Sequence, residues 1–268
     1  MSPIEAIPLM KSRDHKPVLS VVIPCYNEEL RMFHLRKGVW KFVRECQTFD
    51  YEFVFVDDGS TDDTAKYLDQ LAFNLNRTDI PLLKGAFTVK ASQNGGKGAA
   101  LRNGVLSARG DYILTVDCDM ATPITQILEW EKQGVFRPYE ETSAQVLFLG
   151  NRRNDDTKNS LLRSVMSTTF NLCCRFVAGL PLNDTQCGFK IYPRRVGRNL
   201  FKGLKELGWA HDIELLCKAR LSGMTLKPLA VNWQAIEGSK VNVIKDSIKM
   251  FVSIFKIRLS VINVRGVS

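Results

Sequence analysis

The stretch Tyr-Ile-Leu-Thr-Val-Asp-Cys-Asp, residues 112–119, carries the pattern on which the expected fold of this chain depends. Its first five residues, 112–116, are a short apolar run, and an acidic pair follows directly. Residues 19–24 and 52–56 repeat the apolar run, and residues 146–149 form a fourth one. Short runs that are rich in β-branched residues and end at proline, glycine or acidic residues are typical of buried parallel strands.

Helical stretches lie between these strands, at residues 28–46, 62–75 and 97–107. Strands that alternate with helices predict an α/β fold, a Rossmann-like, mostly parallel open sheet flanked by helices. Right-handed crossovers would place all strand C-termini along one edge, where such sheets bind ligands. We therefore expect the polar residues that follow the strands to converge at this edge: Asn27, Glu28, Asp57, Asp58, Asp117, Asp119 and Arg152.

Composition narrows the class of protein. A chain of 268 residues can bury a sizeable core, and 45% hydrophobic residues exclude a disordered or collagenous chain. The net charge of +9 favours a polyanionic partner, which is a nucleic acid, an anionic membrane or a phosphorylated substrate. Seven cysteines without a Cys-x-x-Cys pair favour a reducing compartment over a disulfide framework or a zinc site. Residues 1–17 are a charged N-terminal extension, and no apolar run is long enough to span a membrane.

Two later segments, residues 160–177 and 241–264, have helical periodicity. In the second, at about 100° per residue, one apolar stripe contains Ile244, Ile248, Phe251, Phe255, Leu259 and Ile262, with Lys245, Lys249 and Lys256 beside it. A basic helix of this kind lies in a membrane surface or packs on the core, and both interpretations stay open. The chain thus divides into the extension 1–17, an α/β domain 18–240 and a basic amphipathic C-terminal helix 241–268.

Asp117 and Asp119 form the sharpest local signal. Two carboxylates one residue apart at the end of a strand can hold a divalent cation and leave positions open for diphosphate oxygens. Hard oxygen ligands suit Mg²⁺ or Mn²⁺. Acidic pairs are also common in turns, but Asp57 and Asp58 end the preceding strand. Four carboxylates at one edge need a cation or hydrogen-bond donors to compensate them.

The segment Asn-Gly-Gly-Lys-Gly, residues 94–98, is not a Walker A loop. Ala91 stands where that motif has its first glycine, and Gly98 follows the lysine in place of Ser or Thr. Nor does it have the spacing of a dinucleotide fingerprint, so a nucleotide phosphotransferase or an NAD-dependent oxidoreductase is disfavoured. The segment is typical of a glycine turn that opens a helix, to which Lys97 adds a phosphate contact.

These motifs occur in the order found in one family. Through residues 24–28 (Pro-Cys-Tyr-Asn-Glu), 56–62 (Val-Asp-Asp-Gly-Ser-Thr-Asp), 94–98 and 117–119, the chain resembles family 2 glycosyltransferases of the GT-A fold. Its later half looks like the dolichyl-phosphate β-glucosyltransferase group, with the related polyprenyl-phosphate enzymes close behind. The residues that carry this second resemblance are 184–190 (Asp-Thr-Gln-Cys-Gly-Phe-Lys), 209–216 (Trp-Ala-His-Asp-Ile-Glu-Leu-Leu), 231–233 (Val-Asn-Trp) and 237–240 (Glu-Gly-Ser-Lys).

The resemblance implies an inverting, metal-dependent transfer of a hexose, glucose from UDP-glucose, to a polyprenyl or dolichyl phosphate, with a β-linked product. It implies that residues 18–240 are a GT-A catalytic domain, with Mg²⁺ or Mn²⁺ on Asp117 and Asp119. The implied contacts to the nucleotide sugar are Pro24, Tyr26, Glu28, Asp58, Lys97, Asp117, Arg152 and Gln186. The implied catalytic residues are Asp212, Arg163 and Lys240.

The acceptor decides what Asp212 must do. A phosphate monoester is largely ionised at neutral pH and needs little deprotonation, so Asp212 would orient the acceptor. The alternative is a family 2 transferase that acts on a saccharide or small-molecule hydroxyl, in which Asp212 would be the general base. Ala121 stands where related mannosyl-phosphate enzymes often have Gln, which favours the glucosyl group.

Two expectations concern partners and location. The basic residues are spread along the chain and no readout motif occurs, so a nucleic-acid-binding module is disfavoured. Eukaryotic members of the resembled group usually begin with a membrane-spanning segment, which this sequence does not contain. We therefore expect peripheral contact with the cytosolic face of a membrane, through residues 160–177 and the basic C-terminal helix.

Overall fold

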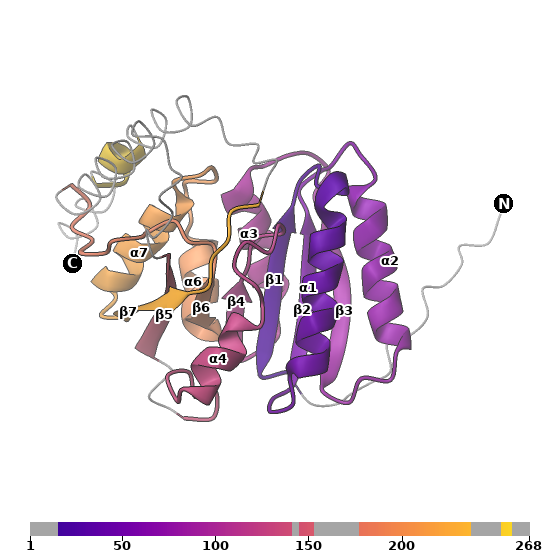
Figure 1. Cartoon of the computed structure of the whole chain (residues 1–268). Helices are drawn as coiled ribbons and strands as arrows, with labels where there is room; N and C mark the ends of the chain where they lie inside the picture. The colour runs from indigo at the N-terminus through magenta and orange to yellow at the C-terminus, as the bar shows by residue number, and fades with distance from the viewer. Residues whose placement is uncertain (1–15, 141–144, 153–176, 237–252, 259–268) are drawn as a thin grey trace.

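The computed structural model describes residues 16–140, 145–152, 177–236 and 253–258. Within these residues, one seven-stranded sheet has the order β3-β2-β1-β4-β6-β5-β7 (Figure 1). The strands are β1 (Leu19–Cys25), β2 (Tyr51–Asp57), β3 (Leu83–Lys90), β4 (Tyr112–Thr115), β5 (Val146–Arg152), β6 (Lys190–Pro193) and β7 (Thr225–Val231). The helices are η1 (Glu29–Arg31), α1 (Met32–Glu45), α2 (Thr64–Arg77), α3 (Lys97–Ser107), α4 (Gln126–Lys132), α6 (Arg194–Lys202) and α7 (His211–Leu221).

Helices cover both faces of the sheet, so the fold has three layers (Figure 1). In β2, Tyr51, Phe53 and Phe55 belong to one core cluster, and Val54 and Val56 belong to the other. This alternation follows from the two-residue period of a strand. Helices α1, α2 and α4 pack on the first face, and α3, α6 and α7 pack on the second. Burial on both faces explains why the central strands are near-continuous apolar runs.

The sheet is mostly parallel, as predicted, with one reversed strand. β1 pairs in parallel with β2 and β4, and β5 pairs in parallel with β7. β6 is antiparallel to both β4 and β5. The edge that holds the carboxyl ends of the other strands therefore also holds the amino end of β6. Lys190, the first residue of β6, pairs with Thr115, the last residue of β4, and reaches this edge.

The four predicted strands and three predicted helices are confirmed to within a few residues, and the helix predicted at 97–107 matches α3. The sequence analysis missed β3, β6, β7 and the helices α4, α6 and α7. β3 carries Lys84 and Gly85 within its apolar pattern, and β6 is only four residues long. Neither segment therefore has the uninterrupted apolar run by which the other strands were predicted.

The predicted helix 160–177 lies almost wholly outside the described residues, as does most of the C-terminal helix 241–268. Residues 253–258 are helical, with Ile254 and Ile257 buried in the second core cluster. Phe255, a member of the predicted apolar stripe, is 54% exposed. The described part of this helix therefore packs on the core through residues beside that stripe. No helix in the described ranges is long and apolar enough to cross a membrane.

Candidate active site

Asp117 follows β4 at the carboxyl edge of the sheet and forms an ion pair across it. Its Oδ1 lies 2.6 Å from Nζ of Lys97, the first residue of α3. Desolvation would raise the pKa of Asp117, but the Lys97 ammonium outweighs this effect and lowers the pKa. Desolvation would likewise lower the pKa of Lys97, but Asp117, followed by Asp212, raises it. Both side chains are therefore charged at neutral pH.

Asp119 has a different cation beside it. Its Oδ2 lies 3.6 Å from Nη1 of Arg31, and its Oδ1 accepts a 3.0 Å hydrogen bond from the backbone N–H of Ala121. Arg31 also donates two hydrogen bonds, of 2.5 and 2.6 Å, to the Glu28 carboxylate. The side chains of Asp117 and Asp119 are 37% and 26% exposed, so a ligand can reach both carboxylates.

The two carboxylates fit a divalent cation such as Mg²⁺ or Mn²⁺, which prefers oxygen ligands. Gly188 leaves the room that the Asp117 carboxylate occupies, because a Cβ at Gly188 would lie 2.4 Å from both carboxylate oxygens. In the part of the chain that the structure describes, no group of three His, Cys, Asp or Glu side chains is placed to hold a metal. A cation on Asp117 and Asp119 would therefore complete its coordination with substrate oxygens and water.

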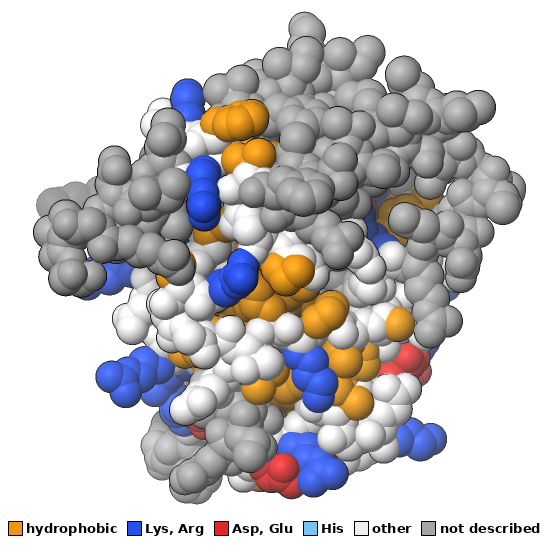
Figure 2. All heavy atoms as spheres, turned by 90° about the vertical axis from the view of Figure 1, so that its left-hand side faces the viewer, with side chains coloured by type: hydrophobic (Ala, Val, Ile, Leu, Met, Phe, Trp, Pro, Cys, Tyr) orange, Lys and Arg blue, Asp and Glu red, His pale blue; other side chains and the backbone are white. Residues whose placement is uncertain are grey.

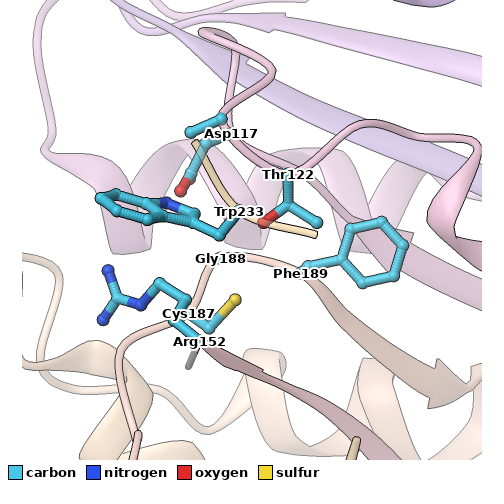
Figure 3. Close-up of a pocket in the computed structure, with 8 residues that line it drawn as sticks. Asp117, Thr122, Arg152, Cys187, Gly188, Phe189 and Trp233 are labelled. Atoms are coloured by element: carbon cyan, nitrogen blue, oxygen red, sulfur yellow. The ribbon is translucent and has the colours of Figure 1, made fainter. Parts of the chain in front are cut away.

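A pocket opens beside Asp117 (Figure 3). Trp233, two residues after β7, lies between Asp117 and Arg152 in this view. The guanidinium carbon of Arg152 is 5.7 Å from the centroid of the Trp233 ring, within the range of a cation–π contact. The remaining lining residues are Ala121, Thr122, Cys187, Gly188 and Phe189. Two residues predicted to contact the donor, Asp117 and Arg152, thus border the same pocket.

Arg152 is held by a bidentate ion pair. Its Nε and Nη2 donate to the Asp184 carboxylate at 2.7 and 2.9 Å, and its backbone N–H donates to the same carboxylate at 3.1 Å. The backbone N–H of Gln186 donates to Asp184 at 3.1 Å, which places Gln186 in the same turn. Desolvation would lower the pKa of Arg152, but Asp184 outweighs it and raises the pKa. Arg152 is therefore a fixed positive charge at the pocket wall.

Asp212, in the first turn of α7, is paired with a lysine to which the sequence analysis assigned no role. Nζ of Lys190 lies 2.8 Å from Oδ1 of Asp212 and donates a 2.5 Å hydrogen bond to the Cys187 carbonyl. The side chains of Lys190 and Asp212 are only 2% and 7% exposed. Desolvation would raise the pKa of Asp212, but the neighbouring positive charges, Lys190 first among them, lower it. Asp212 is thus an ionised carboxylate and a weak base at neutral pH.

His211 packs beside this pair. Its Nδ1 is 2.7 Å from the Gly208 carbonyl oxygen, and its Nε2 is 3.5 Å from Oδ1 of Asp212. Nε2 is buried and has no hydrogen-bond partner among the described residues. Burial lowers the pKa of His211, which favours the neutral ring at physiological pH.

Asp58 anchors the glycine turn that presents Lys97. Its buried carboxylate accepts the backbone N–H groups of Gly95 and Gly96 at 3.1 and 2.8 Å. Burial raises the pKa of Asp58, and these hydrogen bonds oppose the rise. Gly96 has a φ of 93°, and a Cβ there would lie 2.7 Å from the Leu207 carbonyl oxygen. The turn therefore requires glycine, and it fixes the position from which Lys97 reaches Asp117.

The loop after β1 is tied to the loop after β2. The backbone N–H of Asn27 donates to Ser60 Oγ at 2.9 Å, and that of Glu28 donates to Thr64 Oγ1 at 2.7 Å. Tyr26, one residue after β1, is 38% exposed at this edge. Tyr26, Glu28 and Asp58 thus lie in two linked loops, and Pro24 lies next to them near the end of β1, at the place where the nucleotide contacts were predicted.

The structure brings together most of the residues that were predicted from the sequence, and it adds others. Arg163 and Lys240 lie outside the described residues. The sequence analysis assigned no role to Arg31, Asp184, Lys190 or Trp233, although it quoted the last three within motifs. Lys190 is the first residue of β6, and all four residues of this strand are buried. A lysine in such a strand is the signal that would have indicated a buried ion pair.

Residues 20–196 match the family model of Glycosyl transferase family 2. Among curated proteins, the chain is 33% identical over 248 residues to the dolichyl-phosphate beta-glucosyltransferase of Dictyostelium discoideum, covering 90% of this chain and 73% of that protein. It is 32% identical over 260 residues to the Saccharomyces cerevisiae protein of the same name, covering 92% of this chain and 76% of the yeast protein.

Solved structures agree on the fold. The Mycobacterium tuberculosis glucosyl-3-phosphoglycerate synthase in complex with Mn²⁺ and UDP-glucose superposes with a TM-score of 0.61 at 17% identity, covering 93% of this chain and 81% of that one. The UDP complex of the same enzyme gives a TM-score of 0.60 at 19% identity, covering 97% of this chain and 86% of that one. The predicted GT-A-like α/β fold is therefore confirmed.

Proposed function

This chain belongs to glycosyl transferase family 2, and we propose that it transfers glucose from UDP-glucose to the phosphate of a polyprenyl or dolichyl phosphate. Relatives at 31–33% identity carry the name dolichyl-phosphate beta-glucosyltransferase, which supports this acceptor. A solved neighbour in complex with Mn²⁺ and UDP-glucose supports this donor. The product would be a lipid-phosphate sugar with inverted, β configuration.

The state of Asp212 is the observation that carries the choice of acceptor. A hydroxyl acceptor needs a general base whose pKa lies near the working pH. The Asp212 carboxylate is buried, and Lys190 lies 2.8 Å away and lowers its pKa. A phosphate monoester is already largely ionised at neutral pH and attacks without such a base. The ion pair therefore favours a phosphate acceptor over the saccharide-hydroxyl alternative.

The donor rim, defined as Glu28, Arg31, Lys97, Asp117 and Asp119, would bind the nucleotide diphosphate. Asp117 and Asp119 would hold Mg²⁺ or Mn²⁺, which supplies positive charge to the departing nucleoside diphosphate when bound. Lys97, fixed by the glycine turn, is placed to turn from Asp117 toward a phosphate oxygen. Arg31 would keep Asp119 in place through the ion pair described above.

The acceptor rim, defined as Arg152, Asp184, Lys190, His211 and Asp212, would receive the lipid phosphate. Arg152 is the cation of this rim that lines the pocket, and arginine matches phosphate oxygens well; Lys190 lies buried behind it. Asp184 and Asp212 hold these two cations in position through the ion pairs described above. We assign Asp212 an orienting role and expect positioning and electrostatics to supply most of the rate enhancement.

We also propose peripheral contact with the cytosolic face of a membrane, where a polyprenyl phosphate resides. On the face of the molecule at β7, hydrophobic side chains gather among Lys and Arg side chains (Figure 2). Lys227, Pro228 and Ala230 of β7 are exposed there. Phe255 is exposed on the C-terminal helix. Apolar groups ringed by basic ones suit an anionic bilayer surface.

One incubation tests the reaction. Purified protein, MnCl₂ or MgCl₂, radiolabelled UDP-glucose and a polyprenyl phosphate are mixed, and the label is followed into the organic phase. We expect label in the organic phase with the phosphate acceptor, none with free polyprenol, and loss of transfer when EDTA removes divalent metal. Equal transfer to a saccharide hydroxyl would contradict the assignment of the acceptor.

The variant Asp212→Asn tests the role of Asp212. If this residue orients the acceptor, the variant retains measurable transfer to the phosphate and keeps the wild-type pH profile. If it is the general base, the variant loses most of its transfer, and its residual activity no longer falls at acidic pH.

Liposome flotation tests membrane contact: we expect binding to anionic vesicles that weakens with salt and on removal of residues 243–268.

A further inference from the structure

Two buried thiols meet between the donor-binding loops. Cys25 is the last residue of β1, and Cys118 stands between Asp117 and Asp119. They are 2% and 5% exposed and belong to the same core cluster. The proposed reaction uses neither thiol, although each adjoins a residue of the proposed nucleotide site. Their chemistry is therefore unassigned.

The register of the sheet places the two cysteines opposite one another. β1 and β4 pair in parallel from Leu19 with Tyr112 to Val22 with Thr115, a constant offset along both strands. The backbone N–H of Val116 still donates to the Val22 carbonyl at 3.1 Å, so the two chains stay adjacent beyond the last ladder pair. Cys25, at the end of β1, and Cys118, in the turn after β4, follow on these adjacent segments.

The side chains meet as the register predicts, because the two thiols form a hydrogen bond. Adjacent strands are about 4.8 Å apart, and disulfides form between residues whose Cα atoms are about 4.4–6.8 Å apart. The spacing of neighbouring strands therefore lies within the range that a disulfide requires.

We propose that Cys25 and Cys118 are a redox-sensitive pair that closes a disulfide across the mouth of the donor site. Hydrogen peroxide is the oxidant: the two thiols lose two electrons and two protons, an S–S bond forms, the O–O bond breaks, and two molecules of water leave. A small dithiol reverses the step by thiol–disulfide exchange and is itself oxidised. Burial makes the oxidation slow, because only the small fraction of thiolate in opened molecules reacts.

Closure changes the donor site. An S–S bond of about 2.05 Å is shorter than any non-bonded contact between two sulfur atoms, so the segments that carry them must approach. Cys25 leads directly into Tyr26, and Cys118 is bonded to both Asp117 and Asp119. The approach therefore turns the two carboxylates away from the positions in which Lys97 and Arg31 meet them. This consequence rests on the proposed function, whereas the disulfide itself does not.

Other cysteines of the described chain provide matched controls. The Cys46 thiol donates to the Phe49 carbonyl at 3.6 Å, and the Cys217 thiol donates to the Ala178 carbonyl at 3.6 Å. Both are buried, as Cys25 and Cys118 are. The Cys25 thiol likewise donates to a backbone carbonyl, that of Ile23 at 3.9 Å, but its other contact is the Cys118 thiol. Cys46 and Cys217 therefore test whether burial of a thiol, without a second sulfur facing it, is enough to make the protein sensitive to peroxide.

The first experiment is chemical and needs no activity. The full chain is treated with hydrogen peroxide, alkylated, digested without reduction and mapped by mass spectrometry. We expect a Cys25 peptide joined to a Cys118 peptide with the loss of two hydrogens, and both peptides separately alkylated after dithiothreitol. Peptides that stay unjoined, or a Cys118 peptide joined to another cysteine, would overturn the proposal.

The second experiment measures UDP release, with each variant compared with its own reduced form. We expect peroxide to remove most of the wild-type activity and dithiothreitol to restore it, whereas Cys25→Ala and Cys118→Ala keep the activity of their reduced forms. Cys46→Ala should remain as sensitive as wild type. Equal peroxide sensitivity in Cys118→Ala, or a mapped disulfide without loss of activity, would contradict the switch. If no form releases UDP, the proposed function fails, and the peptide map still decides the disulfide.

Discussion

The donor rim and the acceptor rim each contribute one residue to the pocket, Asp117 and Arg152, but the two rims are built differently. In the donor rim, the side chains of Asp117 and Asp119 are 37% and 26% exposed, beside Lys97 and Arg31. In the acceptor rim, Lys190 and Asp212 are 2% and 7% exposed. In the proposed function, the donor-rim carboxylates would leave a lysine and hold a metal ion. In the acceptor rim, the Lys190–Asp212 pair is desolvated and stays closed, whereas Arg152 remains partly exposed.

This difference in exposure separates residues that would bind substrate from residues that stabilise the fold. A partly exposed ion pair contributes little to stability, because water competes for both charges. A buried pair leaves an uncompensated charge when one partner is removed, so its loss destabilises the fold. We therefore expect substitutions in the donor rim to remove activity with little effect on folding. Substitutions in the acceptor rim should affect both.

The largest expected effect is in the donor rim. Asp119→Ala should lower sugar transfer by at least about a thousandfold, because it removes a carboxylate that would hold the cation at the leaving group. Its unfolding free energy should stay near that of wild type. Radiolabel transfer and urea denaturation measure the two quantities. Asp69→Ala is the control, since Asp69 forms an exposed ion pair with Lys90 and should transfer normally. Turnover of Asp119→Ala near the wild-type rate would contradict the role of the donor rim in sugar transfer.

Lys190→Met should give the largest loss of stability. The variant leaves the Asp212 carboxylate buried without its partner, which costs about 3–5 kcal/mol in comparable cases. The matched control, Lys90→Met, removes a lysine from an exposed pair and should change the unfolding free energy by no more than about 1 kcal/mol. Adding Asp212→Asn to Lys190→Met should recover part of the loss, because no charge then remains unpaired. Equal losses in the two lysine variants would mean that the rims do not differ.

Gly188→Ala should sharpen the comparison by moving one donor-rim carboxylate. The new Cβ would lie 2.4 Å from both Asp117 carboxylate oxygens, and the Asp117 side chain can rotate away without moving the backbone. We expect about a hundredfold loss of transfer, the size typical of one displaced electrostatic group. Unfolding free energy should change little.

Gly203→Ala is the matched glycine control for this variant. The nearest atom to its new Cβ is 3.6 Å away, which is ordinary van der Waals contact. Transfer by Gly203→Ala should therefore equal that of wild type in the same assay. A Gly188→Ala protein that transfers normally would contradict the placement of Asp117 at the reacting end of the donor.

Local patterns predicted the donor rim well. Glu28, Lys97, Asp117 and Asp119 each stand at the end of a predicted strand or the start of a predicted helix, so short-range periodicity was enough to place them. Parallel crossovers then bring them to one edge. Arg31 was missed because its contact with Asp119 joins the start of α1 to the loop after β4.

Sequence patterns could not predict the pairing within the acceptor rim. Arg152 meets Asp184 and Lys190 meets Asp212 only because β6 enters the sheet antiparallel between β4 and β5. β6 has four residues, too few for a periodicity that reveals its direction. The C-terminal stripe illustrates the same limit, because Ile254 and Ile257 pack on the core and Phe255 of the stripe is exposed.

The smallest expected effect is a dependence of stability on pH in the acceptor rim. The folded-state pKa of Asp212 is lowered, chiefly by Lys190, against the desolvation that would raise it. A lowered pKa contributes stability that is fully present above the unfolded value of about 3.9 and is lost as the pH falls through the folded value. The gap in unfolding free energy between wild type and Asp212→Asn should thus be constant near neutral pH and narrow below about pH 4.

Urea denaturation of both proteins across this pH range measures the gap directly. Asp119→Asn is the matched variant, because Asp119 is partly exposed and its nearest cation lies 3.6 Å away. The gap between wild type and Asp119→Asn should be small at every pH, since water screens that pair. If the Asp212 gap instead widened on acidification, the folded-state pKa of Asp212 would lie above its unfolded value. With a raised pKa, Asp212 could act as a general base, and this result would favour the alternative in which the acceptor is a hydroxyl group.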